Sequence, residues 1–253
     1  MKMISNIIIL VLFLYFAIGI YLYIKQKNFL YFPTKAVVHG HETIQFHNDG
    51  ESINVIVLNP GQQKALLYFG GNAETVAWGA AVFEEKLPKY TTYMLEYRGY
   101  GESSGEPSEE GLFSDALYIF DHIRQKHDSI SLFGRSLGTG LASFVAAKRD
   151  VDKMVLITPF DSIENLAQKR FPIYPMSLLL KDKYDSISYV PDIKADTIVL
   201  IASEDTVIPT KHTYALVKAF PESQIKTVTI EGSGHNDIAY TKEYHKALEE
   251  FLK

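Results

Sequence analysis

The sequence predicts an α/β protein built on a mostly parallel sheet of about eight strands with helices on both faces. Short strand-like runs recur along the chain, and segments with helical periodicity separate the later runs. These later runs are continuously apolar, as is typical of strands buried on both faces of a sheet. At 253 residues and 47% hydrophobic content, without repeats or a long linker, the chain is suited to one such domain.

Each element is predicted from its own pattern. The strand-like runs cover residues 43–47, 53–58, 65–69, 92–97, 129–133, 153–158, 197–202 and 226–231. The helical patterns cover residues 75–85, 109–126, 138–148, 211–220 and 240–252. In sheets of this kind the working groups collect in loops beyond the carboxyl ends of the strands, so a functional site is expected there.

An apolar segment precedes the domain. Residues 7–24, IIILVLFLYFAIGIYLYI, carry no charge and would span about 27 Å as a helix, close to the thickness of a bilayer core. The chain then continues YLYIKQKNFLYF, without the small residues of a signal-peptide cleavage site. Residues 1–28 are therefore predicted to be an uncleaved membrane anchor and residues 29–253 one domain. Lysines flank both sides of the segment, which leaves the facing of the domain open.

The composition excludes several classes of function. The chain has 25 basic and 30 acidic side chains and a formal net charge of -5, so it offers no basic footprint for nucleic acid. It has no cysteine, which rules out disulfides, iron–sulfur clusters, cysteine-ligated metals and a thiol nucleophile. No metal or organic cofactor is implied by its motifs.

Two serine motifs fit the pattern glycine, any residue, serine, any residue, glycine. GRSLG at 134–138 directly follows a strand-like run and leads into a helix that opens with small residues. That context holds a serine on a tight strand-to-helix turn, where glycines let strand and helix approach. GESSG at 101–105 stands apart from its strand and leads into a proline. Ser136 is thus the predicted nucleophile, and Ser103 is predicted to be a loop residue.

A serine hydroxyl needs an imidazole to accept its proton and a carboxylate to orient that imidazole. Among the eight histidines, only His235 sits in a glycine-rich loop straight after a strand, in TIEGSGHND. Glu204 and Asp205 end one predicted strand, and Asp161 follows another. Spacing does not separate Glu204 from Asp205, and Asp161 is a third candidate.

An acyl-transfer site also needs N–H donors for a developing oxyanion. One is expected from Leu137, the residue after the nucleophile, at the start of a helix. The other is expected from the loop in ALLYFGGNAET, where two glycines allow close backbone approach. The main-chain N–H of Asn72 is the predicted donor in that loop, with Ala73 as the next choice.

Together these segments resemble the α/β-hydrolase superfamily, specifically the small membrane-anchored hydrolases related to serine-aminopeptidase-like proteins. The matching segments are FLYFPT at 29–34, FGGNAE at 69–74, YRGYGESSGEPSEEG at 97–111, GRSLGTG at 134–140, DSI at 161–163, SEDTVIP at 203–209 and GHND at 234–237. The order Ser136, acid, His235 also matches this arrangement. The resemblance implies that Asp205, rather than Glu204, is the triad acid. Gly70 departs from the family, which usually has histidine there.

These features predict a serine hydrolase that cleaves carboxylic ester or thioester bonds through an acyl-enzyme. The anchor keeps the site near lipids or acylated proteins, which favours acyl substrates over soluble peptides. A serine peptidase and a catalytically silent binding module are the alternatives. Residues 158–192, which contain FPIYPMSLLL, are expected either to form a small cap that receives an acyl chain or to pack on the sheet as a helix.

Overall fold

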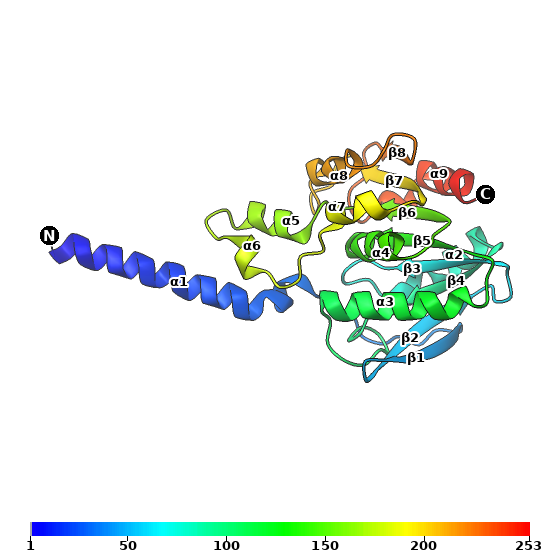
Figure 1. Cartoon of the computed structure of the whole chain (residues 1–253), viewed down its shortest axis with the longest axis horizontal. Coiled ribbons are helices and arrows are strands. Elements are labelled where there is room, and N and C mark those ends of the chain that lie inside the picture. The colour runs from blue at the N-terminus through cyan, green and yellow to red at the C-terminus, as the bar shows by residue number, and fades with distance from the viewer. Residues whose placement is uncertain (1) are drawn as a thin grey trace.

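One sheet forms the centre of the computed structural model, which describes residues 2–253 and contains eight strands in that range (Figure 1). The strands are β1 (Glu42–Asn48), β2 (Glu51–Leu58), β3 (Lys64–Phe69), β4 (Tyr90–Leu95), β5 (Ser129–Arg135), β6 (Lys153–Ile157), β7 (Asp196–Ala202) and β8 (Ile225–Ile230). Their order across the sheet is β1-β2-β4-β3-β5-β6-β7-β8. Strand β2 runs antiparallel to β1 and β4, and the other neighbours pair in parallel. The predicted fold class is confirmed.

Helices precede the sheet and connect its parallel strands. The α-helices are α1 (Lys2–Leu30), α2 (Ala80–Lys86), α3 (Glu109–Arg124), α4 (Leu137–Lys148), α5 (Ile163–Arg170), α6 (Met176–Leu179), α7 (Ser186–Tyr189), α8 (Thr210–Val217) and α9 (Lys242–Leu252). Three short 3-10 helices lie within the described residues, η1 (Val76–Gly79), η2 (Val190–Asp192) and η3 (Ile238–Tyr240). The Ser108 hydroxyl accepts the N–H of Gly111 at 3.2 Å and so caps α3.

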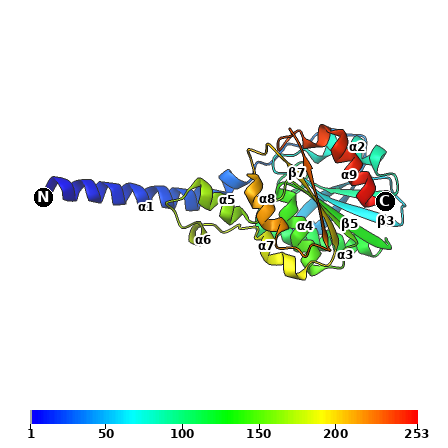
Figure 2. The same ribbon diagram turned by 90° about the horizontal axis from the view of Figure 1, so that it is seen from above.

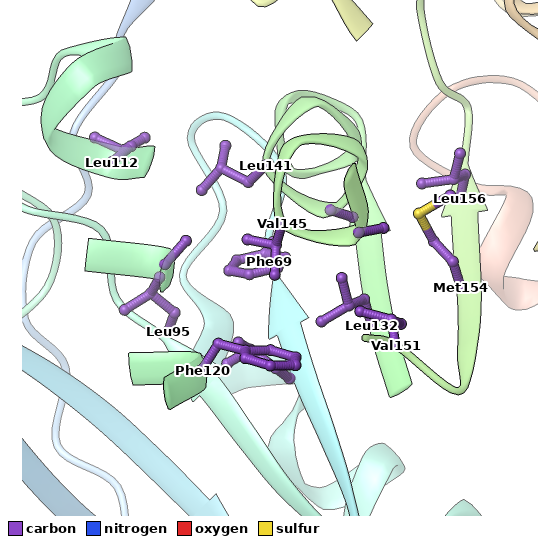
Figure 3. Close-up of a cluster of buried hydrophobic side chains, with 14 of the residues drawn as sticks. Phe69, Leu95, Leu112, Phe120, Leu132, Leu141, Val145, Val151, Met154 and Leu156 are labelled. Carbon is purple, nitrogen blue, oxygen red and sulfur yellow. The ribbon is translucent and has the colours of Figure 1, made fainter. Parts of the chain in front are cut away.

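Two hydrophobic cores hold helices to the two faces of the sheet. Helices α3, α4 and α8 pack on one face, and α2 and α9 pack on the other (Figure 2). Figure 3 shows part of the first core, where Phe69 and Leu132 of the sheet meet Phe120 of α3 and Val145 of α4. Burial of each such side chain contributes about 1.5–3 kcal/mol to the stability of the fold. This packing holds the strand ends and the loops that follow them in place.

The strand expected at residues 92–97 begins and ends two residues earlier. The chain leaves the sheet at Glu96, whose carboxylate accepts hydrogen bonds from the Asn54 side chain and the Glu102 N–H, each at 2.9 Å. These bonds fold the chain back into the loop that carries GESSG. A local apolar pattern does not reveal this polar contact with a distant strand.

Helix α1 projects from the domain as an extended arm (Figures 1 and 2). Its most apolar window has a mean hydropathy of 2.8, and only 6% of that window is buried. The helix is long and apolar enough to cross a membrane. A signal sequence near an N-terminus meets the same criterion of length and composition.

The connection between β6 and β7 holds α5, α6, α7 and η2. Its first part, α5 and α6, lies beside the C-terminal half of α1 in both views (Figures 1 and 2). Its second part, α7 and η2, packs against α4 on the sheet. The second part thus packs on the sheet, and a cap that receives an acyl chain stays a prediction.

Candidate active site

Ser136 sits on a sharp turn between β5 and α4. Its backbone has φ 50° and ψ -116°, a conformation that costs a non-glycine residue about 1–3 kcal/mol. The Ser136 N–H donates to the Ile157 carbonyl at 2.9 Å and helps to hold the turn. A Cβ on Gly138 would lie 2.0 Å from the Phe69 carbonyl oxygen, and one on Gly134 would lie 2.5 Å from the Gly138 carbonyl oxygen. Glycine at both positions is therefore required for β3, β5 and α4 to meet.

Three loops bring Ser136, His235 and Asp205 together. The Ser136 Oγ lies 2.9 Å from Nε2 of His235, and Nδ1 of His235 lies 2.7 Å from Oδ2 of Asp205. The loops follow β5, β7 and β8, so all three side chains stand at the carboxyl edge of the parallel strands. The His235 and Asp205 side chains are 7% and 3% exposed. This arrangement can pass a proton from a serine hydroxyl to an imidazole oriented by a carboxylate.

The geometry distinguishes the three candidate acids. Besides His235, Asp205 accepts hydrogen bonds from the N–H groups of Val207 and Ile208, at 2.9 and 2.7 Å. Its neighbour Glu204 is exposed to solvent. Asp205 is therefore the acid that contacts His235 and is fixed by its own loop.

Asp161 belongs to a different pair. Its Oδ1 lies 2.8 Å from Nδ1 of His212, and both side chains are buried. It also accepts hydrogen bonds from the Ser162 N–H and the Asn165 side chain, each at 2.8 Å. This second pair joins the start of the connection after β6 to helix α8 and leaves His235 to Asp205.

Ser103, in the second serine motif, is a buried structural residue. Its hydroxyl donates to the Glu96 carbonyl at 2.7 Å and accepts the Asn54 N–H at 2.8 Å. Both bonds fasten the loop to the edge of the sheet next to β2 and β4. The hydroxyl is committed to the backbone, unlike that of Ser136, which faces an imidazole.

The loop after β3 lies directly beside the serine. A Cβ built on Gly71 would be 3.6 Å from the Ser136 Cβ. The Asn72 side chain ties this loop to the end of α1, because it donates to the Leu30 carbonyl and accepts the Phe32 N–H at 3.0 Å. Leu137 is the first residue of α4, where an N–H has no intrahelical acceptor. The oxyanion roles of Leu137 and Asn72 stay predictions.

Sequence reasoning missed a polar cluster under this loop. The Glu74 carboxylate accepts the Gly71 N–H at 2.7 Å, the Tyr68 hydroxyl, and an Arg135 guanidinium N–H at 2.8 Å. Arg135 also donates to the Asn236 side chain at 3.2 Å, next to His235. Burial, followed by the neighbouring Glu74 carboxylate, raises the pKa of Tyr68 well above its usual value, so this hydroxyl stays a donor.

The surroundings of Gly70 leave no room for the histidine that the family resemblance implies there. A Cβ at Gly70 would lie 2.7 Å from Val76 Cγ1 and 3.4 Å from the Glu74 carboxyl carbon, so a larger side chain has no room. The Gly70 carbonyl accepts the Tyr97 hydroxyl at 2.7 Å. The position of Glu74 inside the FGGNAE segment was the available signal, but its contacts join residues that are distant in sequence.

Two cavities among the described residues are lined in part by sequence neighbours of the triad residues. One, of about 630 Å³, lies between α1, the connection after β6 and the loop 206–209 that follows Asp205. The other, of about 570 Å³, lies between α2 and α9 and reaches Arg135 and Asn236. Both volumes are in the range of small-molecule sites.

Comparison with known proteins agrees with the fold. The family model described as alpha/beta hydrolase fold matches residues 64–180. An uncharacterized protein of Mycobacterium tuberculosis (strain H37Rv) is 30% identical over 240 residues, which cover 87% of this chain and 85% of that protein. Alpha/beta hydrolase domain-containing protein 17C of Xenopus laevis is 26% identical over 200 residues, covering 77% of this chain and 63% of that protein.

Solved structures share the fold at lower sequence identity. The Pyrococcus furiosus esterase Pf2001 superposes with a TM-score of 0.69 at 16% identity, covering 87% of this chain and 95% of that chain. Est1E from Butyrivibrio proteoclasticus, with ferulic acid bound, gives a TM-score of 0.69 at 16% identity, with 83% and 97% coverage. The chain belongs to the α/β-hydrolase family. Membership of this family supports hydrolase activity.

Proposed function

We propose that this chain is a membrane-anchored serine hydrolase that cleaves carboxylic ester or thioester bonds. The observation that carries the proposal is the 2.9 Å contact between Ser136 Oγ and His235 Nε2, on an imidazole that Asp205 holds at 2.7 Å. The strained serine backbone and the close approach of the Gly71 loop support the same reading, because both are features of a nucleophile turn facing an oxyanion site.

In the proposed reaction Ser136 Oγ attacks the acyl carbonyl carbon while His235 Nε2 accepts the hydroxyl proton. The carbonyl oxygen becomes an oxyanion that accepts hydrogen bonds from the Leu137 and Asn72 N–H groups. The imidazolium, stabilised by Asp205, protonates the leaving alcohol or thiol as its bond to the acyl carbon breaks. A water molecule, deprotonated by His235, then cleaves the acyl-enzyme and releases the acid.

The substrate class follows from where the site would stand. Anchoring by residues 7–24 would hold the triad within one domain diameter of the bilayer, near lipids and acylated proteins. Most of the residues that line the 630 Å³ cavity are apolar, which favours acyl chains over charged peptides. A serine peptidase and a silent binding module are the outcomes that an assay must distinguish from this one.

A fluorophosphonate activity probe on the full chain in detergent tests the proposal. The wild type should be labelled, Ser136→Ala should lose labelling, and Ser103→Ala should keep it once circular dichroism shows that the variant is folded. Ser103 is a matched control because it occupies the same five-residue pattern, but its hydroxyl forms hydrogen bonds with backbone groups. An unlabelled wild type would favour a binding module. p-Nitrophenyl esters of graded chain length, assayed beside aminoacyl arylamides, separate an esterase from a peptidase.

A further inference from the structure

The connection after β6 contains an apolar, uncharged segment with large side chains that are exposed to solvent. Residues 171–180, FPIYPMSLLL, lie between the basic pair 169–170 and Lys181. Within the segment, Ile173 is 68% exposed and Leu178 is 79% exposed. Neighbouring large apolar side chains left in this state commonly mark a surface that something apolar covers.

This segment packs against the middle of the apolar helix. The ring of Tyr174 stacks on that of Tyr15 with centroids 4.8 Å apart, and its hydroxyl donates to the Tyr15 carbonyl at 3.2 Å. In return the Tyr15 hydroxyl donates to the Ile173 carbonyl at 2.9 Å. Tyr15 stands at the centre of the charge-free residues 7–24. If those residues span a bilayer, Ile173 and Tyr174 lie within its hydrocarbon layer.

Lys181, which follows the apolar segment, lies beside the end of the apolar part of α1. Gln26 accepts the Lys181 N–H at 2.7 Å and donates to the Leu179 carbonyl at 3.2 Å. The Lys181 ammonium lies 4.8 Å from the centre of the Tyr23 ring. Lysines at 25 and 27 follow on α1. The Lys181 charge that ends the segment therefore lies beside the end of the apolar part of α1, where lipid headgroups would lie.

Several polar groups of the segment backbone are paired, which favours transfer into a hydrocarbon layer. The N–H of Tyr174 donates to the Phe171 carbonyl at 3.1 Å, and that of Leu180 to the Met176 carbonyl at 2.9 Å. The Met176 N–H donates to the Gln168 side chain at 3.1 Å, and the Pro172 carbonyl accepts from the same side chain at 3.3 Å. Such pairing lowers the cost of transferring an irregular backbone out of water.

The 630 Å³ cavity opens between the segment and α1. Leu22 and Phe29 of α1 form one wall, and Leu166 of α5 and Met176 of α6 belong to the other. Its inner end is the loop 206–209, whose N–H groups at 207 and 208 bind the carboxylate of the triad acid. The cavity thus extends from the flank of an apolar helix to the loop that follows Asp205.

We propose that the apolar segment 171–180 inserts into the bilayer beside α1, and that the cavity between them receives the acyl chain of an ester directly from the hydrocarbon layer. The proposal rests on the membrane-anchored hydrolase proposed above and adds the route by which its substrate arrives. An acyl chain that enters by this route never crosses water. The ester carbonyl is then delivered at headgroup level beside Ser136. Lys181, beside the end of the apolar part of α1, would meet anionic headgroups at the entrance.

Single cysteines can measure insertion, because the natural chain has none. Ile173→Cys and Leu178→Cys, labelled with an NBD fluorophore in the full chain, are placed in vesicles of phosphatidylcholine and phosphatidylglycerol. Lipids spin-labelled in the acyl chain should quench both probes more strongly than headgroup-labelled lipids. Val38→Cys, a fully exposed apolar position on the domain, should show no quenching. Ile9→Cys reports on α1 by itself.

The outcomes separate the two proposals. Quenching at Ile9 without quenching at Ile173 and Leu178 would overturn insertion of the segment while leaving the anchor in place. Absence of quenching at all three positions would overturn both the anchor and the insertion. Neither result depends on catalytic activity, so a failure of the hydrolase assignment would be recognised separately by the fluorophosphonate probe.

Activity measures delivery of the acyl chain. Leu178→Asp should lower the ratio of hydrolysis of a vesicle-embedded long-chain ester to that of a soluble short-chain ester by about tenfold or more, since a charge in the hydrocarbon layer is costly. Val38→Asp is the matched control and should keep the wild-type ratio. A phosphatidylcholine with a photoreactive diazirine in its acyl chain should crosslink to α5, which lines the cavity. Crosslinks confined to α1 with an unchanged ratio would overturn the route.

Discussion

The carboxylate of Glu74 and the guanidinium of Arg135 form an ion pair of 2.8 Å between the loop after β3 and the residue that precedes Ser136. Both side chains are largely buried, and Glu74 also holds the Gly71 N–H. The two sides of the proposed oxyanion site are thus coupled by one carboxylate.

Glu74→Gln should therefore weaken catalysis without removing the nucleophile. The variant leaves the Arg135 charge without its partner, and the Gly71 loop loses a charge-assisted hydrogen bond of about 1.5–3 kcal/mol. We expect kcat/KM on a short ester to fall about tenfold, with fluorophosphonate labelling slowed but not abolished. Glu51→Gln, at a partly exposed position at the start of β2, is the control. Wild-type kinetics in Glu74→Gln would refute the coupling.

Restoring the histidine at position 70 should not improve the enzyme. Because a Cβ there already meets Val76 Cγ1 at 2.7 Å, Gly70→His must displace Val76 or Glu74. Overpacking of this kind typically costs about 1–3 kcal/mol. The free energy of unfolding and the ester hydrolysis rate should both fall. A more active Gly70→His variant would contradict the packing argument.

Asp205→Asn and Glu204→Gln should differ sharply. The first change removes the carboxylate that fixes the His235 tautomer, and in a serine triad this lowers kcat by about a thousandfold or more. The second alters an exposed side chain and should leave kcat within about twofold. Ester hydrolysis under saturating substrate measures both. Equal rates in the two variants would overturn the assignment of the acid.

Asp161→Asn should affect stability more than chemistry. The buried Asp161 and His212 form a pair with a 2.8 Å contact, and breaking such a pair leaves polar groups without partners at a cost of roughly 3 kcal/mol. Denaturant unfolding should show the loss, while kcat per folded molecule stays near that of the wild type. A thousandfold loss of kcat with unchanged stability would instead make Asp161 part of the catalytic machinery.

Tyr100 should make stability sensitive to alkaline pH. Burial raises its pKa to about 12, and its hydroxyl donates to the Asn72 side chain at 2.8 Å. The unfolded chain ionises this group near pH 10, so the folded state loses stability as the pH rises from about 10 to 12, and below about 10 the contribution is complete. Tyr100→Phe should lose less unfolding free energy than the wild type over that interval. Parallel pH curves for the two proteins would refute this.

Local patterns in the sequence predict the fold class, the positions of most helices and strands, and the candidates for the triad. Periodicity, apolar runs and strand-end loops are local patterns, and the rule that strand carboxyl ends share one edge of a parallel sheet brings Ser136 and His235 to the same edge. Their catalytic roles remain proposals, but their placement follows from the chain. The long apolar helix can also be predicted from the sequence, because its length and hydropathy do not depend on contacts with other segments.

Three features depend on contacts between distant segments: the bond between Asp205 and His235, the support of the loop at Gly70, and the position of residues 171–180. Glu204 and Asp205 are adjacent, so the direction of each side chain depends on loop hydrogen bonds that no pattern displays. The Glu74 cluster and the stacking of Tyr174 on Tyr15 join residues separated by up to 159 positions. Such contacts are fixed by the packing of whole elements, and local sequence carries no record of them.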